Sequence, residues 1–252
     1  MTFDVAGEAY GRFMGRYSEP LATVFADWAG VGRGDRVLDV GCGPGALTAV
    51  LRERTAPGNV AAADPSAPFV ESIRSRFPDL EVHRCPAEQL PFGDAQFDRA
   101  LAQLVVHFMQ DPVTGLAEMA RVTRPGGTVA ACVWDLAGDR SPLSTFWSAA
   151  RRLDPSVADE SERAGARKGH LAQLATEAGL TEVESSELRV VVTHPSFEEW
   201  WEPYTLGVGP AGDHMASLDP RARDDLREEC RSALPDGAFD VTAVAWAVRG
   251  RA

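Results

Sequence analysis

The chain has 252 residues, of which 44% are hydrophobic and 25% are charged, and its formal net charge at pH 7 is −12. A chain of this length can bury a full core without disulfides or a structural metal. The acidic balance argues against nucleic-acid phosphates and against an anionic membrane surface as binding partners.

Cysteine spacing and hydropathy narrow the class of protein further. The four cysteines, Cys42, Cys85, Cys132 and Cys230, form no CxxC pair and lie at no zinc-ligand spacing from a histidine. No N-terminal charged segment precedes an apolar run, and no stretch approaches about 18 uninterrupted apolar residues. We therefore expect reduced thiols, no metal, no signal peptide and no membrane span, in a cytoplasmic protein with one domain over residues 1–252.

Residues 1–35 place aromatic and aliphatic side chains three or four positions apart, which predicts a helical N-terminal flap. Two glycines, Gly11 and Gly15, weaken this segment as one helix. A break between Gly11 and Ser18, followed by a helix from Glu19 to Gly30, fits the pattern equally well.

Short apolar strands then alternate with helical patterns, and residues 36–135 form the predicted ligand-binding core. The predicted strands are 36–40, 59–64, 80–84, 97–104, 128–134, 182–193 and 241–249. The alternation predicts an α/β fold with a doubly wound, mostly parallel, seven-stranded Rossmann-like sheet. Ligands of such sheets bind outside the carboxyl ends of the strands.

Residues 195–238 form a predicted helical insertion before the last strand. Its aromatic stretch 197–204 and its charged amphipathic stretch 220–234 both have helical spacing. An insertion near the carboxyl edge of the sheet can cap the pocket as a lid. Its apolar content fits a homodimer contact or a greasy substrate equally.

The stretch from Val37 to Thr48 runs from a strand through Gly41, Gly43 and Gly45 into a helical pattern. Such a turn lets a ligand approach backbone amides at a helix N-terminus. It also satisfies the G-x-G-x-x-A dinucleotide fingerprint, with Asp64 near the position of a ribose-binding acid. These features alone fit NAD as well as another adenosyl ligand.

Three observations favour the other adenosyl ligands over NAD. Asp39 lies two residues before Gly41, and a second carboxylate there repels a pyrophosphate but suits a cationic ligand. A polar, acidic turn at residues 85–92 follows the third strand, beside the place where an adenine ring would lie. No tyrosine has a lysine four positions later, so the acid of short-chain dehydrogenases is absent.

Taken together, these motifs resemble the class I S-adenosylmethionine-dependent methyltransferases, in the small-molecule branch that includes the ubiquinone- and menaquinone-biosynthesis enzymes. The resemblance covers residues 37–134 and extends loosely to residues 10–17. The stretches that carry it are 37–45, Asp64, Ala87-Glu88, 90–92, 97–98 and 124–127.

The resemblance implies S-adenosylmethionine as cofactor, S-adenosylhomocysteine as product, and roles for individual residues. Asp64 would accept hydrogen bonds from both ribose hydroxyls, and Ala87 and Glu88 would meet the adenine edge. His107 would act as a general base or orient the substrate beside the methyl group. The implied cofactor-binding residues are Tyr10, Arg16, Asp39, Gly41, Cys42, Gly43, Asp64, Pro65, Ala87, Glu88 and Gln103.

The implied function is methyl transfer to an O, N or C atom of a small-molecule acceptor, with no nucleic acid as partner. Two alternatives stay open. One is a cofactor-binding protein that does not methylate, such as a cyclase on the same fold. The other is an NAD-dependent oxidoreductase. A purely structural role also fits two of these residues. Asp64 fits the N-cap of the following helix, and His107 fits a packed histidine at a helix start.

Overall fold

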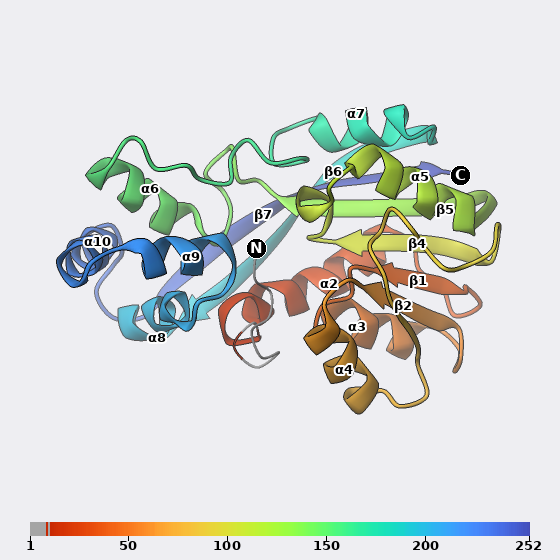
Figure 1. Cartoon of the computed structure of the whole chain (residues 1–252), viewed down its shortest axis with the longest axis horizontal. Coiled ribbons are helices and arrows are strands. Elements are labelled where there is room, and N and C mark those ends of the chain that lie inside the picture. The colour runs from red at the N-terminus through yellow and green to blue at the C-terminus, as the bar shows by residue number, and fades with distance from the viewer. Residues whose placement is uncertain (1–8, 10) are drawn as a thin grey trace.

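A computed structural model describes residue 9 and residues 11–252 and contains one mixed, seven-stranded sheet (Figure 1). The strand order is β3-β2-β1-β4-β5-β7-β6. The strands are β1 (Val37–Val40), β2 (Val60–Asp64), β3 (Glu81–Arg84), β4 (Phe97–Gln103), β5 (Thr123–Trp134), β6 (Thr181–His194) and β7 (Phe239–Arg251). This confirms the predicted α/β sheet.

The first five strands are parallel to one another, whereas β7 runs antiparallel to both β5 and β6. Every residue of β1 and β2 is buried, as expected of strands covered on both faces. From β1 the chain passes to β2 and β3 on one side and then returns to β4 on the other. The resulting switch point between β1 and β4 is where ligands of this kind of sheet bind.

Helices cover both faces of the sheet (Figure 1). One face carries α2 (Arg16–Trp28), α3 (Ala46–Arg54) and α4 (Ala67–Arg76), and the other carries α5 (Pro112–Val122) and α7 (His170–Glu177). Each face has its own apolar core, with Leu21, Phe25 and Leu51 fully buried in one and Leu116 and Met119 fully buried in the other.

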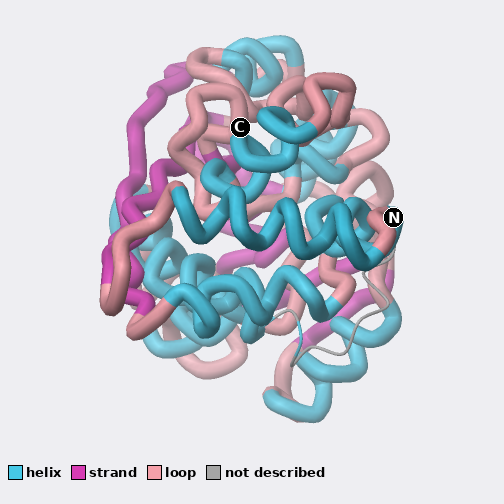
Figure 2. Tube along the Cα trace, turned by 90° about the vertical axis from the view of Figure 1, so that its left-hand side faces the viewer, coloured by secondary structure: helices cyan, strands magenta, loops and turns pink. Residues whose placement is uncertain are grey.

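A second group of helices gathers at the end of the molecule toward which β4 points. It contains α6 (Ser144–Leu153), α8 (Phe197–Trp201), α9 (Gly209–Ser217) and α10 (Pro220–Ser232). Seen from that end, these helices lie in front of the strands (Figure 2). The insertion at 195–238 therefore stands over the carboxyl edge of the sheet. Within the described residues, no helix is both long enough and apolar enough to cross a membrane.

The described part of the N-terminal segment is helical, as predicted, and lacks the break of the alternative form. Gly11–Gly15 is a π-helical turn that continues directly into α2, so the described chain has no break before Ser18. Tyr17, Leu21 and Phe25 of α2 are buried. The glycines therefore widen one helical turn and do not divide the segment.

Two elements in the insertion are also placed differently from the prediction. The α-helix from Phe197 ends at Trp201 and continues to Leu206 as a 3₁₀ turn. Helix α9 was not predicted, because its first turn reads Gly-Pro-Ala-Gly and carries weak helix formers.

The Pro125-Gly126-Gly127 stretch lies inside β5, which begins at Thr123 and not at the predicted residue 128. Its glycines serve close backbone packing instead. A Cβ on Gly127 would lie 2.7 Å from the Asp98 carbonyl oxygen and 2.8 Å from that of Arg124. The Gly127 carbonyl also accepts a hydrogen bond from the Ala252 N–H at 3.2 Å.

We predict that Gly127→Ala lowers the free energy of unfolding by about 1–3 kcal/mol, because the added methyl group overlaps backbone oxygens held in the sheet. Urea denaturation measures the loss. Gly34→Ala is the matched control, since a Cβ on Gly34 meets nothing within 4 Å, and its effect should stay within about 0.5 kcal/mol. Equal losses in the two variants would contradict this account.

Candidate functional site

The turn after β1 packs closely against the end of β4. Gly41 has φ +68°, and a Cβ on it would lie 2.4 Å from a methyl group of Val105, so a larger residue does not fit. Gly43 has φ +52°, and a Cβ there would meet nothing within 4 Å. The buried Cys42 lies between them and donates its N–H to the Ala63 carbonyl oxygen at 3.1 Å. One side of this turn is thus fixed to the sheet, while Gly43 is open to a ligand.

Asp64, at the end of β2, holds the turn through both oxygens of its carboxylate. Oδ2 accepts the Gly43 N–H at 2.8 Å, and Oδ1 accepts the Ser66 N–H at 2.8 Å. Burial raises the pKa of Asp64, although these two backbone hydrogen bonds oppose the shift. Because each carboxylate oxygen has two lone pairs, each can still accept one more donor.

Asp39, on β1, lies beneath the turn and is 1% exposed. Its Oδ2 accepts a hydrogen bond from Thr48 Oγ1 at 2.6 Å. Burial raises the pKa of Asp39 to about 7, and the Thr48 hydrogen bond only partly offsets this. Asp39 therefore changes charge near neutral pH and does not carry a fixed negative charge.

A cleft of about 420 Å³ opens beside the turn, at the switch point of the sheet. Such a volume lies within the range of small-molecule sites in proteins. The predicted residues among those lining it are Gly41, Pro65, Ala87 and Glu88. The others include Val105, Phe108, Met109 and Thr114.

Glu88 fastens the far wall of this cleft. Its Oε1 accepts the backbone N–H groups of Gln110 at 2.8 Å and Asp111 at 3.1 Å. Ala87 is buried, and a Cβ on Gly115 of α5 would lie 3.4 Å from its methyl group. Ala87 and Glu88, which are predicted to meet the adenine edge, therefore line the cleft, and Glu88 Oε1 already accepts two backbone hydrogen bonds.

Gln103 and His107 flank the end of β4, where Leu104 adopts the left-handed backbone conformation with φ +61°. Gln103 Nε2 donates to the Ser18 carbonyl oxygen at 2.9 Å, and its Oε1 has no hydrogen-bond partner among the described residues. His107 is buried, and its ring centroid lies 3.9 Å from that of Phe108. Burial, aided by the charge of Arg163, lowers the pKa of His107 to about 3.

A second, mainly apolar cavity of about 40 Å³ lies on the other side of Phe108, which lines both spaces. It is bounded by the ends of β4 and β5, the π-helical turn and the start of α9. Its walls include Phe13, Met14, Leu104, His107, Trp134, Leu143 and Glu160.

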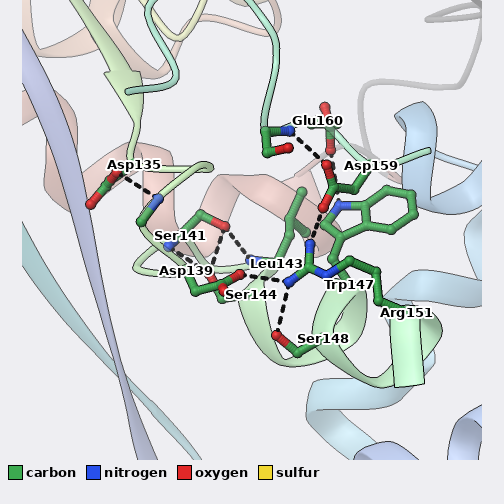
Figure 3. Close-up of polar contacts among 12 residues, drawn as sticks. Asp135, Asp139, Ser141, Leu143, Ser144, Trp147, Ser148, Arg151, Asp159 and Glu160 are labelled. Atoms are coloured by element: carbon green, nitrogen blue, oxygen red, sulfur yellow. Dashed lines mark hydrogen bonds and ion pairs between the residues drawn. The ribbon is translucent and has the colours of Figure 1, made fainter. Parts of the chain in front are cut away.

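Glu160 is held in that wall by a polar network that begins on α6 (Figure 3). Trp147 Nε1 donates to Glu160 Oε2 at 3.2 Å. One turn later, Arg151 binds Asp159 and also donates to Ser148 Oγ at 3.2 Å. The network fixes the loop after α6 so that the next residue, Glu160, reaches the cavity.

One predicted site residue, Arg16, has its partners elsewhere. Its guanidinium bonds His194 Nδ1 at 2.9 Å and pairs with Glu199 at 2.6 Å. The predicted role of Tyr10 falls on a residue outside the described ones. Phe108, Met109 and Glu160 were not predicted, and only Phe108-Met109, an apolar pair directly after His107, left a signal in the sequence.

Within the part of the chain that the structure describes, no three His, Cys, Asp or Glu side chains are grouped as metal ligands. The site is a cleft beside the glycine turn, with Glu88 and Asp111 in its lining, next to an apolar cavity. Asp64 bonds the turn itself.

The methyltransferase-domain family model matches residues 38–131. Over 140 residues the chain is 35% identical to the uncharacterised methyltransferase Rv3342 of Mycobacterium tuberculosis, covering 56% of this chain and 54% of that protein. The chain therefore spans about half the length of the first curated relatives that it matches.

Two solved structures show the same fold. The geranyl diphosphate C-methyltransferase of Streptomyces coelicolor, solved with S-adenosylhomocysteine, has a TM-score of 0.54 at 15% identity, over 94% of this chain and 80% of that one. The [4+2]-cyclase SpnF has a TM-score of 0.56 at 18% identity, over 92% of this chain and 80% of that one. The ubiquinone and menaquinone branch stays a prediction. The chain is thus similar to methyltransferases over residues 38–131 and shares the fold of solved methyltransferases.

Proposed function

We propose that the chain transfers the methyl group of S-adenosylmethionine to an O, N or C atom of a small-molecule acceptor. The observation that carries this proposal is that Phe108 lines both the cleft at the glycine turn and the apolar cavity. The cleft at the glycine turn is large enough for an adenosyl ligand, and Phe108 separates it from an apolar cavity. A methyl group passing between them would stay out of bulk water.

In this proposal the residues around the cleft hold the cofactor by its different parts. Asp64 accepts the ribose hydroxyls with its remaining lone pairs, and Pro65 lies beside it. The backbone at Gly41, Cys42 and Gly43 receives the methionine part, with Asp39 and Gln103 near its charged groups. Ala87 and Glu88 form the adenine edge. The support is that Gly41, Pro65, Ala87 and Glu88 line one cleft and that Asp64 bonds Gly43.

Methyl transfer from a sulfonium is an in-line displacement on an electrophile that is already activated. The protein mainly supplies position and a dry pocket. His107 lines the apolar cavity and stays neutral at physiological pH, because its pKa is about 3. A neutral imidazole has one nitrogen that can accept a proton, so His107 can serve an acceptor that must lose one.

A second candidate is a protein that binds the cofactor without transferring its methyl group. The fold likeness to the [4+2]-cyclase SpnF supports keeping it. Both candidates require cofactor binding, and only product analysis after incubation with methyl-labelled S-adenosylmethionine distinguishes them.

The decisive first test is calorimetric titration with S-adenosylmethionine, S-adenosylhomocysteine and NAD. The proposal expects saturable binding of the two adenosyl-sulfur ligands and none of NAD. Binding of NAD alone would overturn it in favour of an oxidoreductase.

We predict that Asp64→Ala weakens S-adenosylmethionine binding by roughly 1–3 kcal/mol, because the ribose donors and the Gly43 N–H lose their acceptor. Calorimetry measures the affinity. Asp79→Ala is the control, since Asp79 pairs with Arg52 on the surface and should leave affinity unchanged. Unchanged affinity in Asp64→Ala would refute the ribose role.

We also predict that S-adenosylmethionine affinity rises as pH increases from about 6 to about 7.5, the range in which buried Asp39 loses its proton. The sign follows from the charge: a cationic ligand favours the ionised carboxylate, which is the minor form below its pKa of about 7. Calorimetry at several pH values measures the slope. Asp39→Asn should flatten it, whereas Asp79→Asn should not, and a wild-type slope that persists in Asp39→Asn would contradict the assignment.

A further inference from the structure

Among the described residues, three polar side chains line the apolar cavity beside Phe108, and all are at least nine-tenths buried. His107 is 8% exposed, Trp134 is 2% exposed and Glu160 is 4% exposed. Buried polar groups in proteins nearly always have hydrogen-bond partners, so any that lack one need an explanation.

Two of the three carry an atom with no partner. Trp134 Nε1 and His107 Nδ1 are both shielded from solvent, and neither has a hydrogen-bond partner among the described residues. An indole N–H can only donate, so its missing partner must be an acceptor. Neutral His107 can accept through an unprotonated Nδ1, so its missing partner can be a donor.

The third polar side chain offers no free acceptor. Both oxygens of Glu160 already have partners, because Oε2 accepts from Trp147 Nε1 at 3.2 Å and Oε1 lies 3.5 Å from Arg163 Nε. A carboxylate ligand can accept from Trp134 Nε1 but has no proton to donate to His107 Nδ1. An ammonium ligand can donate to His107 Nδ1 but has no lone pair to offer Trp134.

We propose that the acceptor is a neutral, largely apolar molecule that presents a hydroxyl group, held between Trp134 Nε1 and His107 Nδ1 and methylated on oxygen. This inference rests on the proposed methyltransferase function and names its substrate class. A hydroxyl accepts from Trp134 and donates to His107 at the same time, which neither a carboxylate nor an ammonium group can do.

The step balances without a further reactant. The hydroxyl oxygen forms a bond to the methyl carbon while the bond from that carbon to the sulfonium sulfur breaks. The electron pair of the breaking bond stays on sulfur, giving S-adenosylhomocysteine. The hydroxyl proton passes to His107 Nδ1 and from there to solvent, and the product is a methyl ether.

The size of the cavity indicates which part of the acceptor it holds. About 40 Å³ admits a reacting end but not a whole apolar ring. Residues Val208 to Ala211 form one wall at the start of α9. Gly207, just before this wall, and Gly209, within it, have φ +70° and +62°. An acceptor with a ring would therefore displace this wall of the insertion as it enters.

The test compares p-cresol, p-toluate and 4-methylbenzylamine, which share a methyl-substituted ring and differ in the polar group. Binding is measured on protein saturated with S-adenosylhomocysteine, and turnover with S-adenosylmethionine is followed by mass spectrometry. We expect p-cresol alone to bind and to yield 4-methylanisole.

Trp134→Phe and His107→Ala test whether the acceptor hydroxyl lies between these two side chains. Trp134→Phe keeps a ring but removes the N–H, and it should weaken p-cresol binding at least about tenfold. Trp246→Phe is the matched control, because its Nε1 donates to Asp135 Oδ1 at 2.8 Å, and it should change the affinity less than about twofold. His107→Ala should lower turnover at saturating p-cresol, and affinity for S-adenosylhomocysteine should be equal in all variants.

The outcomes separate the two proposals. If the wild-type protein does not bind S-adenosylhomocysteine, the proposed function fails. If it does, three results overturn the hydroxyl inference alone: binding of p-toluate or 4-methylbenzylamine as tightly as p-cresol, equal effects of Trp134→Phe and Trp246→Phe, or no p-cresol binding at its solubility limit.

Discussion

The hydrogen bond from the Gly43 N–H to Asp64 fixes the geometry on which the rest of the site depends. It joins the turn after β1 to the end of β2, two strands that are neighbours in the sheet. The same turn is held from the other side by Val105, which occupies the space where Gly41 would carry a Cβ. The turn is therefore held between the ends of β2 and β4, and the cleft lies beside it.

Several energetically unfavourable features lie at this edge of the sheet. Two carboxylates, Asp39 and Asp64, are buried close enough that the charge of Asp64 raises the pKa of Asp39. Leu104 takes a left-handed backbone conformation, and Gln103, His107 and Trp134 keep polar atoms without partners among the described residues. Folded proteins tolerate such features when the surrounding structure enforces them, and they cluster at functional sites. The strands that supply the compensating burial, β1 and β2, are apolar apart from the two aspartates.

Sequence reasoning predicted the parts that local periodicity and turn chemistry determine. Strands β1, β2 and β3 lie within one residue of their predicted bounds, and the apolar runs of β1 and β2 end as predicted, before Gly41 and at Asp64. Arg16 could not be placed from sequence, since its partners, His194 and Glu199, are about 180 residues away. Glu160 lies in a polar, turn-rich stretch, and only the fold brings it to the cavity.

Residues of the cleft could be predicted from sequence more fully than residues of the apolar cavity. The residues that line the cofactor cleft, from Gly41 to Thr114, all lie within the matched family segment 38–131. The apolar cavity draws Phe13, Trp134, Glu160 and the start of α9 from outside it. The cleft that we propose for the cofactor therefore lies within the matched segment, whereas the cavity that we propose for the acceptor combines that segment with residues outside it. Substitutions in the N-terminal turn, the loop after α6 or the insertion can therefore change the lining of the cavity without touching the turn between β2 and β4.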